Sequence, residues 1–175
     1  MPDKIVLVRF EGVASSISKS LKRELARVFS LPVEEGTVLP LPNAYDANRH
    51  QYLSLPFLES LLSLKQGKEF ILGITEADLY APGLNFIFGE AALMAGVAVI
   101  SLARLYSSFY GLPEDEDLFK ERVLKEAVHE LGHLFGLKHC PNPHCVMHFS
   151  NSINDTDVKA ASFCEVCKRK LRLNS

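Results

Sequence analysis

The chain has 175 residues and a net charge of −2. A single domain is therefore expected, and the broad basic surface of a nucleic-acid-binding protein is excluded. Hydrophobic residues make up 47% and charged residues 23%, an ordinary composition for a globular protein with an apolar core. No stretch approaches the ~18 apolar residues of a membrane span, and residues 1–10 lack the pattern of a secretion signal. We expect a cytoplasmic, monomeric protein with neither nucleic acid nor a membrane as partner.

The first hundred residues alternate between strand and helix patterns. Runs rich in β-branched and large apolar residues predict four buried strands, at 4–10, 70–74, 84–88 and 97–102. Apolar side chains at helical spacing predict helices at 16–29 and 55–64, with a Pro- and Asn-containing loop at 39–47. Interleaved strands and helices indicate an α/β (α+β) fold with a mixed, twisted sheet.

A third helix is predicted between Pro113 and Gly136. Pro113 is suited to a first helical turn, and acidic residues at 114–117 favour the positive end of the helix dipole. Gly136 can adopt the left-handed conformation that often ends a helix. Beyond it, regular structure is predicted only as a final helix from Asp155 onward.

The third helix carries a His-Glu-x-x-His motif. His129 and His133 are four residues apart and therefore project from one face of the helix. Glu130 lies at the edge of that face. A straight helix would carry His139 away from the metal, but a sharp turn at Gly136 brings it back as a third ligand.

Three neutral imidazoles leave zinc with one open position, as in catalytic rather than structural sites. Such a site lowers the pKa of water and polarises a carbonyl group. Glu130 would then act as the general base and later protonate the leaving amine. This arrangement of His129, Glu130, His133 and His139 predicts hydrolysis of peptide bonds.

Four cysteines lie in the last 36 residues, in the patterns Cys-x4-Cys and Cys-x2-Cys: Cys140, Cys145, Cys164 and Cys167. This spacing favours a second, structural zinc held by four thiolates. Disulfides, or replacement of one thiolate by His144 or His148, are the alternatives. Because neighbouring side chains in an extended segment point in opposite directions, His139 could bind the catalytic zinc while Cys140 binds the structural one.

The full constellation, His-Glu-x-x-His-x-x-Gly-x-x-His-Cys-x4-Cys-x-Met followed by Cys-x2-Cys, resembles the archaemetzincins, a family of metzincin zinc peptidases. The resemblance implies a compact metzincin-like fold with an upper lobe at 1–136 and a small lower lobe at 137–175. It also assigns Met147 to the turn beneath the zinc, although a generic core methionine is the alternative. Phe149 stands where several metzincin groups have a tyrosine.

The resemblance further implies that an edge strand of the upper lobe aligns an extended peptide or protein substrate. The candidate is the segment Leu84, Asn85, Phe86, Ile87 and Phe88, with an ordinary interior strand as the alternative. The expected activity is that of a zinc metallopeptidase, with aminopeptidase action or short-peptide cleavage as options. A zinc-dependent binding or regulatory protein is the second hypothesis, and the intact Glu130 argues against it.

Overall fold

The computed structural model describes residues 1–173, so the last two residues of the predicted lower lobe, Asn174 and Ser175, lie outside the described residues. Its main sheet has five strands in the order β2-β1-β5-β8-β7. They are β2 (Val33–Leu39), β1 (Ile5–Phe10), β5 (Phe70–Thr75), β8 (Val97–Ser101) and β7 (Gly89–Ala92). Neighbouring strands are parallel except β7, which runs antiparallel to β8 along one edge.

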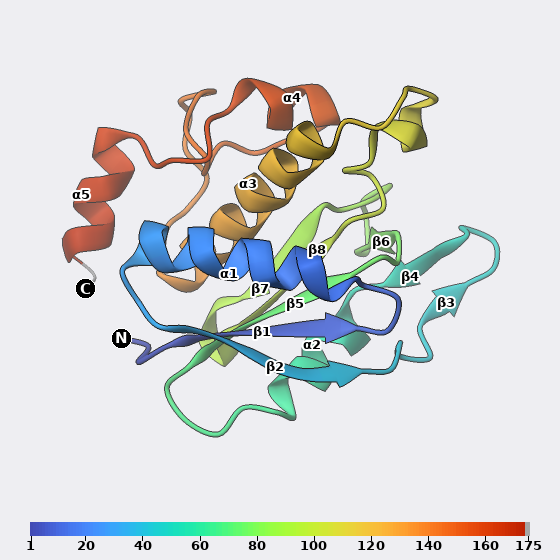
Figure 1. The fold of residues 1–175 in the computed structure, drawn as a ribbon, viewed down its shortest axis with the longest axis horizontal. Coiled ribbons are helices and arrows are strands. Elements are labelled where there is room, and N and C mark those ends of the chain that lie inside the picture. The colour runs from blue at the N-terminus through green and yellow to red at the C-terminus, as the bar shows by residue number, and fades with distance from the viewer. Residues whose placement is uncertain (174–175) are drawn as a thin grey trace.

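Helices cover both faces of this sheet, as Figure 1 shows. Helices α1 (Ser15–Phe29) and α3 (Glu116–Leu134) lie on one face, and α2 (Leu55–Leu62) lies on the other. A small second sheet contains β3 (Tyr45–Asp46), β4 (Gln51–Leu53) and β6 (Leu79–Tyr80). Two short helices, α4 (Ile153–Val158) and α5 (Glu165–Leu173), follow α3. The mixed α/β fold is therefore confirmed.

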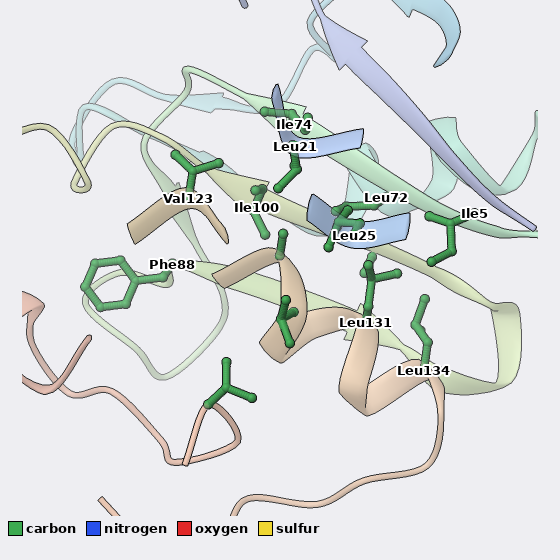
Figure 2. Close-up of a cluster of buried hydrophobic side chains, with 14 of the residues drawn as sticks. Ile5, Leu21, Leu25, Leu72, Ile74, Phe88, Ile100, Val123, Leu131 and Leu134 are labelled. Carbon is green, nitrogen blue, oxygen red and sulfur yellow. The ribbon is translucent and has the colours of Figure 1, made fainter. Parts of the chain in front are cut away.

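The alternation of side chains along the strands divides the core into two layers. Ile5 and Leu7 of β1 face α1 and α3, whereas Val8 and Phe10 face α2. Figure 2 shows the first layer, where side chains of α1 and α3 meet those of β1, β5 and β8. This layer fixes the position of α3, the helix that carries the His-Glu-x-x-His motif.

The prediction of a strand at 84–88 is wrong. The segment is a loop with a single bridge, between Ile87 and Leu79, and the edge strand begins only at Gly89. The carbonyl groups of Leu84 and Asn85 accept hydrogen bonds from the Arg49 side chain instead of from a neighbouring strand. The apolar composition of the segment is explained by its packing, because Ile87 and Phe88 are buried.

Other boundaries also differ from the expectation. Helix α3 begins at Glu116 rather than at Pro113, because the side chain of Asp115 caps it. The final helix is two helices, α4 and α5, separated by residues 159–164. Strand β2 was not predicted, since most of its side chains are exposed and it lacks an apolar run. Within residues 1–173, no helix combines the length and the apolar character needed to cross a membrane.

Candidate active site and metal centres

Helix α3 is defined at both ends by hydrogen bonds that its sequence encodes. At the start, the Asp115 carboxylate accepts from the Leu118 N–H at 3.0 Å, a standard N-cap. At the end, Gly136 has φ +89°. The Gly136 N–H donates to the His133 carbonyl, and the Leu137 N–H donates to the Gly132 carbonyl. This Schellman pattern turns the chain back toward the helix face that carries the histidines.

The three predicted ligands converge at the end of α3. The Nε2 atoms of His129 and His133 lie 3.1 Å apart. The ring of His139 lies 5.3 Å from that of His129 and 4.8 Å from that of His133, measured between centroids. One ligand atom from each residue falls within 4.8 Å of the other two. Tetrahedral zinc with N ligands at ~2.0–2.1 Å separates them by about 3.4 Å, so the donor set fits this metal.

Backbone carbonyl groups orient two of the imidazoles. Nδ1 of His129 donates to the Val146 carbonyl at 2.8 Å, and Nδ1 of His133 donates to the Leu137 carbonyl at 2.8 Å. Both bonds leave the Nε2 lone pair for a metal. Burial, followed by the charge of Lys159, holds the pKa of His129 well below its usual value. Burial also lowers the pKa of His133, and both rings are therefore neutral, as zinc ligation requires.

Glu130 is buried between α3 and the edge strand β7. Only 5% of it is exposed, and burial, together with the charge of Glu126, raises the pKa of its carboxyl group well above the usual range. A Cβ atom on Gly89 would lie 2.7 Å from Cγ of Glu130 and 2.9 Å from the Val99 carbonyl oxygen. Glycine at position 89 therefore leaves the space that the Glu130 side chain occupies.

The histidines and Glu130 open into a cleft of about 690 Å³. All five residues of the predicted substrate-binding segment line it, although they form a loop rather than a strand. Residues from β7 and the turn after it, from α3 and from the segment that follows α3 complete the lining, among them Glu90, Leu93, Glu126, Lys138, Phe149 and Ser150. The volume is typical of a ligand-binding cleft.

The loop at 84–88 is held from two sides by arginines. The Arg49 guanidinium donates to the carbonyl of Leu84 at 2.8 Å and stacks over the Tyr80 ring. Arg104 lies 4.2 Å from the centroid of the Phe86 ring and forms a bidentate ion pair with Asp78. These contacts fix one wall of the cleft.

Met147 lies directly beneath the active-site helix. It is fully buried, and a Cβ atom on Gly132 would collide with its sulfur. The Cys140 N–H donates to the Met147 carbonyl at 2.9 Å, which ties the segment of His139 to that of Met147. Phe149 packs against the His139 ring at 5.1 Å between centroids.

The four cysteines form a second cluster within the described residues. Their Sγ atoms lie within 4.8 Å of one another, and those of Cys140 and Cys164 are 3.8 Å apart. That separation excludes a disulfide between these two, whose S–S length is ~2.05 Å, and equals the ~3.8 Å expected between thiolates on tetrahedral zinc. The Cys167 N–H lowers the pKa of Cys164 to about 7. His148 was the alternative to one of the thiolates, and in the structure its Nδ1 donates to the Cys140 carbonyl.

A buried ion pair that was not predicted from the sequence borders the cleft. Lys159 and Glu126 are 0% and 3% exposed, and Lys159 Nζ lies 3.2 Å from a carboxylate oxygen of Glu126. Thr156 donates to the same oxygen at 3.0 Å. Glu126 stands one helical turn before Glu130, so helical spacing could have placed it beside the site. Lys159 has no comparable sequence signal.

The chain is similar to known proteins along nearly its whole length. The model of peptidase family M54 matches residues 8–173. The archaemetzincin of Pyrococcus furiosus is 49% identical, over 98% of this chain and 93% of that protein. The crystal structure of archaemetzincin from Methanopyrus kandleri has a TM-score of 0.87 and 41% identity, covering 99% of this chain and 95% of that one.

A crystal structure of a zinc-dependent peptidase from Methanocorpusculum labreanum also superposes with a TM-score of 0.87, at 33% identity, and covers 95% of this chain and 99% of that one. The family match spans nearly the whole chain, and the relatives are similar along almost their full length. The chain therefore belongs to peptidase family M54, the archaemetzincins, and is a zinc metallopeptidase.

Proposed function

We propose that the enzyme hydrolyses peptide bonds with a catalytic zinc held by His129, His133 and His139 and with Glu130 as the general base. One observation carries this proposal: the three imidazoles converge beside a buried carboxylate at a cleft of about 690 Å³. A metal-binding module without catalysis would have no use for the carboxylate of Glu130.

Zinc, when bound, supplies a Lewis acid that polarises the scissile carbonyl group and acidifies water at the site. With a cation held by the three imidazoles, the carboxylate of Glu130 would be favoured in its charged form, against the burial that raises its pKa. Glu130 then takes a proton from the attacking water and delivers it to the nitrogen of the leaving amine. The Nδ1 bonds of His129 and His133 keep their rings oriented during these steps.

The open edge of β7 supports a site for the substrate main chain. Phe88 and Ser101 form a hydrogen-bonded pair through the Ser101 N–H. Bonded and non-bonded pairs alternate along an antiparallel ladder, so the peptide groups of Gly89 and Ala91 point away from β8. An extended peptide can pair with these groups, with the loop at 84–88 as part of the same wall. In this proposal, residues 1–136 form the upper lobe of the cleft and residues 137–175 the lower lobe.

We also infer that a second, structural zinc is bound by the four cysteines, giving two zincs per chain. The close approach of their sulfur atoms supports this inference. The cluster would fix Cys140, and with it the neighbouring His139, relative to α5. A monomeric state and a cytoplasmic location stay predictions.

A peptide-library cleavage screen of the zinc-loaded wild type beside Glu130→Gln tests the activity. Glutamine keeps the size of the side chain, which matters because Gly89 packs against it. We expect cleavage by the wild type, a loss of at least about 100-fold in the variant, and equal zinc content in both. Undiminished cleavage by Glu130→Gln would refute the role of the base. A wild type that binds peptides without cleaving them would instead support the binding-protein hypothesis.

A further inference from the structure

The upper wall of the cleft carries a carboxylate that the mechanism does not use. Three glutamates line the cleft, namely Glu90, Glu126 and Glu130. Glu126 is paired with Lys159, and Glu130 is the proposed base. Glu90 has no ion-pair partner within residues 1–173 and is only partly buried. A partly desolvated anion without a counter-ion attracts a cation that enters the same space.

A hydrogen bond from Ser54 orients the Glu90 carboxylate. Ser54, which is 1% exposed, donates its hydroxyl hydrogen to Oε2 of Glu90. Ser54 directly precedes α2, on the face of the sheet opposite α3. This bond uses one carboxylate oxygen and orients the group, while Oε1 accepts no hydrogen bond from the described residues.

The register of β7 places Glu90 beside the path of the substrate. Glu90 pairs with Val99 on β8, and the other side of β7 is the open edge of the sheet. Gly89 faces Glu130, so Glu90 points to the opposite face. A peptide paired along the open edge would present alternate side chains on the same face as Glu90, and opposite charges directly across two strands attract.

We propose that Glu90 selects substrates with a positively charged group at the position opposite it, either the α-ammonium group of the peptide or a Lys or Arg side chain. This inference rests on the proposed peptidase function and adds a substrate class to it. The two sources of positive charge share one chemistry and lead to different cleavage modes. Recognition of the α-ammonium group gives aminopeptidase action, whereas recognition of a side chain gives cleavage within a chain.

Binding of fluorescent peptides to zinc-loaded Glu130→Gln protein tests the proposal without turnover. One peptide pair differs only in a free or acetylated N-terminus. A second set carries lysine or the neutral isostere norleucine at each position in turn. We expect the charged member of one set to bind about fivefold more tightly. That preference should shrink in 1 M salt, where the Debye length falls to ~3 Å.

The added substitution Glu90→Gln should abolish the difference in affinity between the charged and the neutral member of the set. Glu59→Gln is the matched control, because Glu59 is an exposed residue of α2 outside the cleft and its removal changes the net charge equally. Ser54→Ala should reduce the preference without removing it, since the carboxylate remains but loses its orienting bond.

The proposal is overturned if Glu90→Gln keeps the full preference, if Glu59→Gln loses it equally, or if no peptide binds. Cleavage of the neutral peptide by the wild type is measured separately. Charge-selective binding without cleavage would refute the proposed hydrolysis and support the role of Glu90. Cleavage without charge-selective binding would support the proposed hydrolysis and refute the role of Glu90.

Discussion

Before Gly136, the protein is held together by apolar side chains on both faces of a sheet, whereas after Gly136 a few apolar side chains such as Met147 and Phe163 join that core and are accompanied by a cysteine cluster and by ion pairs to α3. The first region buries whole rows of residues such as Ile5, Leu72 and Ile100. The second has only a six-residue and a nine-residue helix within residues 137–173. So short a segment cannot build a sufficient core of its own. Specific polar links and bound metal are the expected substitute.

The two kinds of link act at different places in the second region. The cysteine cluster joins Cys140 to the start of α5. The ion pairs join α3 to α4 and the residue after it, through Arg122 with Asp157 at 2.8 Å and Glu126 with Lys159 at 3.2 Å. His139 directly precedes Cys140 and Met147 follows Cys145 by two residues, so both lie beside the cysteine cluster in the chain.

The largest effect is expected from removing one thiolate. Cys164→Ser should release the second zinc and destabilise residues 137–173 by on the order of 5 kcal/mol or more, because metal binding and folding of such a segment are coupled. Zinc analysis and hydrogen exchange measure this, with α1 as the internal reference that should remain protected. An unchanged melting temperature would contradict the structural role of the cluster.

The next largest effect is expected from Lys159→Met, which leaves the Glu126 carboxylate buried and unpaired. We expect a loss of about 4 kcal/mol in the free energy of unfolding, measured by denaturant unfolding of the zinc-loaded protein. The double variant Glu126→Leu/Lys159→Met removes both charges and should recover most of that loss. If the double variant is as unstable as the single one, packing rather than charge explains the effect.

Leu72→Ala applies the same measurement to the first region. Leu72 is fully buried in the layer between the sheet and the two helices α1 and α3. The cavity left by the substitution should lower the free energy of unfolding by about 3 kcal/mol. Because none of the proposed metal ligands precedes α3, this loss in the free energy of unfolding should be equal whether or not zinc is bound to the cysteine cluster. A loss that changes on removing that zinc would show that the two regions unfold together.

The smallest effect is expected at the start of α3. Asp115→Ala removes the carboxylate that accepts from the Leu118 N–H. This substitution should lower the free energy of unfolding by about 1 kcal/mol. Asp117→Ala, in the same first turn, loses only a helix-dipole interaction and should cost less. Thermal unfolding of both variants is the measurement. Equal losses would show that the charge, rather than the cap geometry, stabilises this end of the helix.

The features that could be predicted from the sequence are those that depend on neighbours along the chain. The helical period places His129 and His133 on one face, and the left-handed turn at Gly136 follows from its position after the last apolar residue of α3. Residues 84–88 were wrongly predicted as a strand because of their apolar character. The carbonyl groups of Leu84 and Asn85 bond to Arg49, which lies 35 residues before Leu84, and no local pattern reveals such a partner.

The sequence by itself predicted two groups of side chains suited to metal binding, three histidines and four cysteines, and the helix that presents two of the histidines, because residue type and spacing are local properties. Only the tertiary structure decided which strand forms the open edge, that Glu126 meets Lys159, and that Glu90 lines the cleft. These contacts join residues far apart in the chain. They depend on the order of strands and the packing of α3 against the following segment, and neither leaves a periodic trace in the sequence.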